Sequence, residues 1–145
     1  MSATQSSTYG TGIGWGAGSE TFFIATNCID GITDTGKICH TKNDRYPWLA
    51  LDFGKTFAIN RVDIFNRHDC CGERTRNVEV RVSEYLPTSA QWKFSGGSLL
   101  GTFLGPGTSG QLIAISGDFP FHVMMKYTCI TRPMEKWQVC HSPDG

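Results

Sequence analysis

The sequence predicts an all-β fold, a jelly-roll β-sandwich of about eight main antiparallel strands. Three observations carry this prediction: short runs of alternating or apolar character, Gly and Pro residues between the runs, and no segment with a convincing helical period. The 145-residue chain holds 17 glycines and 12% aromatic residues, which agrees with many strands joined by tight turns. Strand after short strand of this kind is typical of an antiparallel sandwich.

The predicted strands are short runs bounded by turn residues. In the run 47–54, Leu49, Leu51 and Phe53 share the face that we expect to be buried. Gly54 is expected to end that strand. The other runs expected to be strands are 59–65, 78–82, 99–104, 111–115, 122–130 and 137–140.

Length, charge and cysteine content describe one domain, 1–145, from an oxidising compartment. The formal net charge of +0 argues against a nucleic-acid partner, which needs a basic face. No apolar run is long enough for a transmembrane helix. Six cysteines without a Cys-x-x-Cys pair favour disulfides over a zinc site. The cysteine content therefore predicts a secreted protein. Since the first residues are not a signal peptide, we expect its signal sequence to be absent here.

The stretch 66–74 has the composition of a binding loop. It holds two adjacent cysteines, two arginines and two acids within nine residues. Alternating runs lead into it and out of it, so we expect a loop at one end of a sheet, where a rigid scaffold positions binding residues. A Cys70–Cys71 bond would add little stability but would offer a flat, polarisable, apolar surface. Beside charged arginine donors, that surface suits a monosaccharide, above all a deoxy sugar with a methyl group.

Ordinary structural roles remain open for the same residues. The two cysteines could be reduced or paired elsewhere, and Arg67, Arg74 and Asp69 could be a surface ion-pair cluster. His40 could be a surface residue without function.

Two further features stand outside this stretch. Asn27 and Asp30 could supply oxygens to calcium, or could be turn residues that bond their own backbone. Trp15, at the tip of a glycine-rich loop, is a candidate for an exposed contact, whereas Phe22 and Phe23 are expected to pack onto the core.

Several motifs resemble those of one family, and the stretch 66–74 is the most specific of them. The supporting motifs are the opening strand 3–6, the turn Asn-Cys-Ile-Asp-Gly at 27–31, Cys-His-Thr at 39–41 and Pro-Trp-Leu at 47–49. On these residues nearly the whole chain resembles the F-type lectins, the fucose-binding branch of the discoidin-like (F5/8 type C) domains.

The resemblance implies a sugar site and its supports. It implies that His40, Arg67 and Arg74 hydrogen-bond the sugar, that Asp69 orients an arginine, and that a Cys70–Cys71 disulfide packs on the sugar ring. It implies structural calcium at Asn27, Asp30 and the carbonyl of Ile32, although Ile38 and His141 replace oxygen-bearing side chains of the family. The expected disulfides are Cys70–Cys71 and Cys39–Cys140, with Cys28 and Cys129 either paired or free.

The function expected from this resemblance is that of a secreted, non-catalytic lectin for terminal α-L-fucose, in innate immunity or cell recognition. Its partners would be fucosylated glycans or glycoproteins. It would meet membranes only through surface glycans, and assembly into a homo-oligomer is left open. Trp15 would contact only larger glycans. Two rivals are a discoidin-type membrane- or protein-binding module that uses Trp15, Phe22 and Phe23, and an enzyme with a Cys70 nucleophile beside His40.

Overall fold

The computed structural model describes residues 1–10, 18–33, 38–84, 97–118, 124–131 and 138–139. These residues form strands and three short 3₁₀ turns, and no α-helix lies among them. The strands are β1 (Ser2–Gln5), β2 (Cys39–His40), β3 (Trp48–Ala58), β4 (Arg61–Phe65), β5 (Val78–Ser83), β6 (Ser98–Phe103), β7 (Leu112–Ser116), β8 (Met124–Thr131) and β9 (Gln138–Val139). The 3₁₀ turns are η1 (Glu20–Phe22), η2 (Ala25–Cys28) and η3 (Gly72–Arg74). Nothing in this described part is a helix of the length and apolarity needed to cross a membrane.

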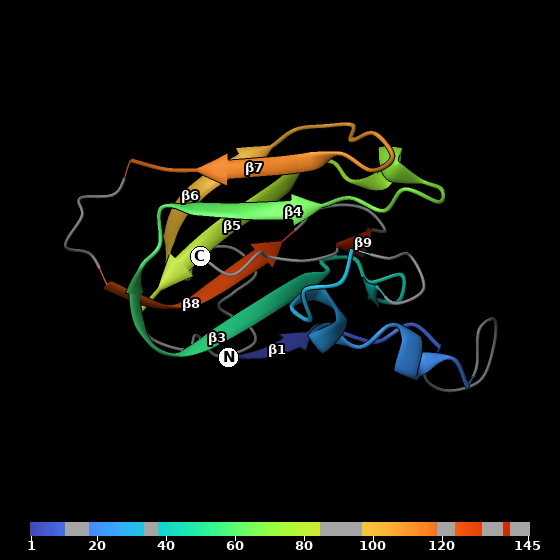
Figure 1. Cartoon of the computed structure of the whole chain (residues 1–145), viewed down its shortest axis with the longest axis horizontal. Helices are drawn as coiled ribbons and strands as arrows, with labels where there is room; N and C mark the ends of the chain where they lie inside the picture. The colour runs from blue at the N-terminus through green and yellow to red at the C-terminus, as the bar shows by residue number, and fades with distance from the viewer. Residues whose placement is uncertain (11–17, 34–37, 85–96, 119–123, 132–137, 140–145) are drawn as a thin grey trace.

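Two layers of antiparallel strands make the body of the molecule (Figure 1). One layer is a five-stranded sheet in the order β1-β3-β8-β5-β6, and the other is the pair β4–β7. A short third pair, β2–β9, lies at one end. The predicted β-sandwich is therefore confirmed.

The core lies between the layers because each strand alternates in burial. On β5, Val78, Val80 and Val82 are buried, and on β4 the buried residues are Val62 and Ile64. Leu49, Leu51, Leu100, Ile113 and Ile115 from the neighbouring strands complete the cluster. Burying one such side chain contributes roughly 1.5–3 kcal/mol, so these residues hold the two layers together.

Strand β3 is longer than the sequence predicts. It continues past Gly54 to Ala58, and its pairing with β8 shifts register between Asp52 and Phe57. Gly54 has φ of 77°, and its N–H donates to Asp52 Oδ1 at 2.8 Å. A glycine in the left-handed region lets a strand bulge without ending, so the expectation that Gly54 terminates the strand was wrong.

One disulfide, Cys28–Cys39, joins η2 to β2 with a Cα–Cα distance of 5.4 Å. This pairing overturns both the expected Cys39–Cys140 bond and a Cys28–Cys129 bond. The cause is local: Asn27 Nδ2 donates to the Ile38 carbonyl at 3.3 Å, which brings η2 against the start of β2. Cys129 lies in the central strand β8, and Cys140 lies outside the described residues.

The loops expected to form the site gather at one end of the sandwich. In Figure 1, η1, η2, η3 and the β2–β9 pair all lie toward the right-hand end of the long axis. The described parts of residues 7–23, 32–47 and 66–76 therefore lie toward the same end of the sandwich.

Candidate functional site

Loop 66–75 connects β4 to β5 and carries most of the predicted site residues. Its turn η3 opens at Cys71, whose φ of 61° is left-handed. A non-glycine residue in that region costs on the order of 1–3 kcal/mol and persists only where its surroundings impose it. Such local strain is common in binding loops, and here it reverses the chain between the two arginines.

Arg67 and Asp69 form a two-pronged ion pair. Arg67 Nε donates to Asp69 Oδ1 at 2.5 Å, and Arg67 Nη2 donates to Asp69 Oδ2. The Arg67 side chain is 13% exposed and that of Asp69 is 39% exposed. The hydrogen bond from Arg67 lowers the pKa of Asp69 to about 2, and the same bond raises the pKa of Arg67. Both groups are therefore charged at neutral pH, and Asp69 orients the guanidinium as the resemblance implies.

Arg74 ends η3 and is exposed. Its backbone N–H donates to the Cys71 carbonyl at 3.1 Å, which fixes the turn that carries it. Within the described part of the chain, no hydrogen bond or ion pair engages its guanidinium. Arg74 thus presents a full set of charged donors at the rim of the loop.

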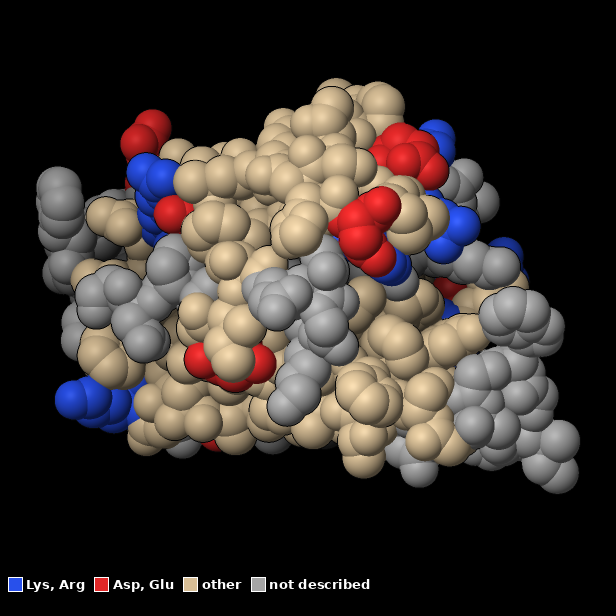
Figure 2. Space-filling view, turned by 45° about the vertical axis from the view of Figure 1, so that its right-hand side comes forward, with Lys and Arg blue, Asp and Glu red and all other residues tan. Residues whose placement is uncertain are grey.

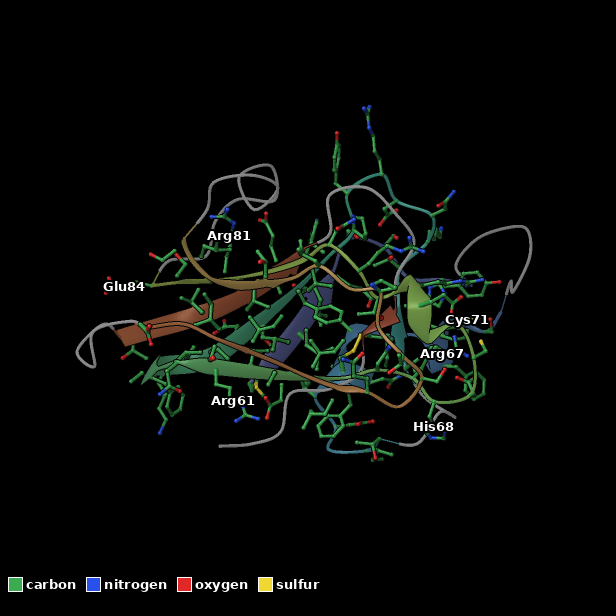
Figure 3. The ribbon with its side chains drawn as sticks, turned by 90° about the horizontal axis from the view of Figure 1, so that it is seen from above. Arg61, Arg67, His68, Cys71, Arg81 and Glu84 are labelled. Atoms are coloured by element: carbon green, nitrogen blue, oxygen red, sulfur yellow. A yellow bond between two sulfur atoms is a disulfide. The ribbon has the colours of Figure 1, made fainter. Side chains whose placement is uncertain are left out.

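Cys70 and Cys71 are free thiols in this structure, with Cys70 exposed and Cys71 half-buried. A side-chain hydrogen bond with Cys71 is the main cause of the raised pKa of Cys70. The expected Cys70–Cys71 bond is therefore not the state described. The thiols meet through a hydrogen bond, which does not require the strained ring that a bond between neighbouring residues would close. Cys71 lies close to Arg67 (Figure 3), and the exposed Cys70 adds a second polarisable sulfur at the surface.

His40 lies on β2, next to the disulfide at Cys39. Its ring packs on Tyr9 and Phe23, with centroids 4.7 Å and 5.6 Å away. Its Nδ1 donates to the Thr41 carbonyl. In a neutral ring that donation leaves the Nε2 lone pair as an acceptor, so aromatic packing and one hydrogen bond set both orientation and tautomer.

The structure brings His40, on the β2–β9 pair, and the two arginines, on the loop between β4 and β5, to the same end of the sandwich. Figure 3 shows Arg67, His68 and Cys71 close together at that end. That His40, Arg67 and Arg74 contact one sugar together stays a prediction. Trp15 lies outside the described residues. Phe22 is 50% exposed, contrary to expectation, whereas Phe23 packs on His40.

Sequence analysis missed the residue that ties the loop together, Asn66. Asn66 is buried; its Nδ2 donates to the carbonyls of Gly72 at 2.8 Å and Thr108 at 2.9 Å, and Thr75 Oγ1 donates to its Oδ1 at 2.8 Å. A polar side chain directly after an alternating strand was the available signal. The loop that Asn66 contacts, 104–111, was predicted only as a connection between strands that contains Gly and Pro.

The residues proposed for calcium serve the turn itself. Asn27 is buried, and its Nδ2 donates to the Phe22 carbonyl at 2.9 Å as well as to Ile38. Asp30 Oδ1 accepts the backbone N–H of Ile32 at 2.9 Å. Among the described residues no group of three His, Cys, Asp or Glu side chains is placed to hold a metal ion. Calcium takes six to eight oxygens, among them amide and backbone carbonyl oxygens, so calcium at Asn27, Asp30 and the Ile32 carbonyl stays a prediction.

Charged side chains of both signs are interspersed on the face in Figure 2, over broad neutral areas. The mixture agrees with the net charge of +0.

Comparison with known proteins gives sequence relatives and a shared fold. A family model described as a NedA-like, galactose-binding domain of the F5/F8 type C group matches residues 27–98. The fucolectin of Anguilla anguilla is 35% identical over 69 residues, which are 45% of this chain and 44% of that protein. This chain thus spans less than half the length of that curated relative.

Two solved structures share the fold. A fucolectin from Morone saxatilis serum has a TM-score of 0.77 at 25% identity, covering 97% of this chain and 44% of that one. A fucose-binding module from Streptococcus pneumoniae has a TM-score of 0.67 at 17% identity, covering 97% and 86%, and shows the fold alone. The names of these proteins describe two fucolectins and a fucose-binding module. Sequence relatives and fold agree: the chain is similar to fucolectins, and its residues 27–98 match the F5/F8 type C-like domains.

Proposed function

We propose that this domain is a lectin that binds terminal α-L-fucose on glycans and glycoproteins. The observation that carries the proposal is the Arg67–Asp69 ion pair on a loop that also presents Arg74 and two cysteine sulfurs. A guanidinium that is locked by a carboxylate is a preorganised donor, because less side-chain entropy is lost when the sugar binds.

The polar contacts divide between donors and an acceptor. Arg67 and Arg74 donate charged hydrogen bonds to ring and hydroxyl oxygens, which are stronger than neutral ones. The Nε2 of His40 accepts from a sugar hydroxyl, since Nδ1 already donates to the Thr41 carbonyl. A sugar with neighbouring hydroxyls meets both needs at once.

The apolar contact comes from Cys70 and Cys71. Cys71 lies close to Arg67 and Cys70 is exposed, so we propose that their sulfurs present a polarisable surface at the loop rim. Fucose is a 6-deoxy sugar, so it carries a methyl group where galactose carries a hydroxymethyl group. We assign that methyl group to this surface. The names of the relatives support the choice, since they include fucolectins and a fucose-binding module.

Calorimetric titration with L-fucose tests the proposal, and L-galactose is its matched ligand control. L-Galactose differs from L-fucose by one hydroxyl on the exocyclic carbon. We expect L-fucose to bind and L-galactose to bind about ten-fold more weakly, because that hydroxyl loses water against sulfur without gaining a partner. Equal affinity for the two sugars would contradict the apolar contact. An absence of L-fucose binding by the wild type, or binding of D-galactose instead, would refute the function.

The exposure of Phe22 favours one rival, a module that binds membranes through its loop tips. Phe22→Ser separates the two functions. A lectin keeps its L-fucose affinity in this variant, whereas a membrane module loses binding to phosphatidylserine vesicles. The thiol enzyme has no such support, because the raised pKa of Cys70 keeps it protonated and therefore weakly nucleophilic.

The setting proposed for this lectin is extracellular. The Cys28–Cys39 disulfide agrees with an oxidising compartment. We further propose that Trp15 contacts only larger glycans and that the fucose site works in innate immunity or cell recognition. Assembly into a homo-oligomer would raise the avidity of a weak monosaccharide site for clustered glycans.

A further inference from the structure

A buried amide, the side chain of Asn66, lies in the loop that carries the two arginines. Asn66 is 5% exposed, and its side chain uses both nitrogen protons and its oxygen in hydrogen bonds. Its backbone N–H also donates to the Gln111 carbonyl at 2.9 Å. A buried amide with every group paired is costly to disturb, because each lost partner leaves a polar atom without water.

The partners of Asn66 are placed so that they control the arginines. Asn66 directly precedes Arg67, and Thr75 directly follows Arg74. Thr75 is 1% exposed, and its Oγ1 donates to Asn66 Oδ1 at 2.8 Å. The hydrogen bond between Thr75 and Asn66 thus joins the residues adjacent to Arg74 and Arg67. It thereby constrains the distance between the Cα atoms of the two arginines.

Loop 104–111 supports the same two points from outside. Gly110 N–H donates to the Arg67 carbonyl at 2.9 Å, and Gly107 N–H donates to the Thr75 carbonyl at 2.7 Å. Its contact with loop 66–75 is so close that a Cβ at Gly72 would lie 2.5 Å from Ser109 N. The approach leaves no room for a side chain at position 72, so the two loops pack backbone against backbone there.

We propose that Asn66 is a positioning residue for sugar binding: through Thr75, Gly72 and Thr108 it holds the two arginines at the spacing that one sugar requires. This inference rests on the proposed fucose function and deepens it. Asn66 touches no sugar itself. The two arginines hold their spacing before binding, and a site preformed in this way loses less entropy when the ligand arrives.

A purely structural Asn66 would affect only stability, so the test compares affinity with stability in a crossed pair of variants. Thr75→Val keeps the volume of the side chain but removes the hydroxyl that donates to Asn66. Thr75→Ser keeps the hydroxyl but leaves a small cavity. We expect Thr75→Val to weaken L-fucose binding about ten-fold and Thr75→Ser to weaken it less than about two-fold. This order of affinities should hold regardless of which of the two variants has the lower melting temperature.

Asn66→Asp gives a second, pH-dependent readout. The new carboxylate faces two carbonyl oxygens, so its pKa rises and the protonated form, which can donate once, gains population as the pH falls. We expect the affinity of Asn66→Asp relative to wild type to recover between about pH 7.5 and pH 5. Calorimetry is run well below the melting temperature of each protein. Val62→Ala, which opens a cavity in β4 without touching these hydrogen bonds, is the stability control.

Three outcomes decide the matter. If affinity follows the hydroxyl at position 75 while Val62→Ala binds as wild type, the positioning role stands. If both Thr75 variants bind as wild type and differ only in melting temperature, Asn66 is merely structural and the inference is overturned. If wild type binds no L-fucose, the proposed function has failed first. Should Asn66→Asp fail to fold, the Thr75 pair still decides.

Discussion

The two halves of the candidate site are held by different means. Loop 66–75 is held by hydrogen bonds that converge on the buried amide of Asn66. The segment around His40 is held by the Cys28–Cys39 disulfide and by ring packing against Tyr9 and Phe23. The arginine half is therefore fixed by polar groups and the histidine half by covalent and apolar contacts.

This difference predicts how each half fails. A hydrogen-bonded loop depends on individual donors and acceptors, so single substitutions and pH disturb it while the core stays intact. A segment held by a disulfide resists such changes but responds to reductant, because reduction of that one bond removes the cross-link. Perturbations that act on one half alone therefore separate binding from stability.

The largest effect is expected from the histidine half. Replacing both cysteines in Cys28→Ala/Cys39→Ala removes a cross-link over a sequence separation of 11 residues. The free energy of unfolding should fall by about 2–4 kcal/mol, and urea denaturation measures it. A reductant should destabilise wild type and leave the double variant unchanged. Equal sensitivity of both proteins to reductant would contradict the assigned pairing.

The arginine half should show loss of binding without loss of stability. Arg67→Ala removes a charged donor worth roughly 1.5–3 kcal/mol, or about one to two decades in L-fucose affinity. Arg67→Lys should fail as well, because an ammonium cannot reproduce the fork.

Arg61→Ala is the matched control for this prediction. Arg61 pairs with Asp63 two residues on, at 2.6 Å, but on the exposed face of β4 away from the loop. Its loss should leave affinity and melting temperature nearly unchanged. Weakened binding in the Arg61 variant would indicate that general charge, rather than the locked fork, attracts the sugar.

A smaller effect follows from the pKa of Asp69. Its folded pKa is lowered to about 2 by Arg67, so the ion pair contributes its full stability above the unfolded value near 4 and loses it as the pH falls through about 2. Since Asp69 is partly exposed, we expect at most about 1 kcal/mol. Acid unfolding of wild type and Asp69→Asn measures the difference. The prediction would be contradicted if the difference in unfolding free energy between wild type and Asp69→Asn grew as the pH rose above neutral.

The smallest effect is expected from chelation. Asn27 Nδ2 and Asp30 Oδ1 make hydrogen bonds around the turn, and calcium bound there would stabilise the folded state by mass action. A melting temperature that EDTA lowers and added calcium restores would support the predicted ion. An unchanged melting curve would assign both residues to the turn alone.

Much of the site could be predicted from the sequence because its decisive contacts are local. Arg67 and Asp69 are two residues apart, so their pairing needs only the loop that joins β4 to β5. The alternating runs before and after that loop predict its place at the end of a sheet. The raised pKa of Cys70 likewise arises mainly from its neighbour, Cys71.

The contacts that join distant segments could not be predicted in the same way. Asn66 meets Thr108 because the pairing of β4 with β7 brings their ends together. Six cysteines leave many pairings open, and the Cys28–Cys39 bond follows from the hydrogen bond that brings η2 to β2.

The sequence by itself determined the strand pattern, the position of the binding loop and the chemistry it offers, because these depend on the order of neighbouring residues. Only the tertiary structure decided how the loop is held. Burial made Asn66 a hydrogen-bonding centre, since an amide shielded from water must pair with whatever carbonyls and hydroxyls the fold brings to it. The spacing of Arg67 and Arg74 is therefore set by a residue that carries no charge and that is buried away from the solvent.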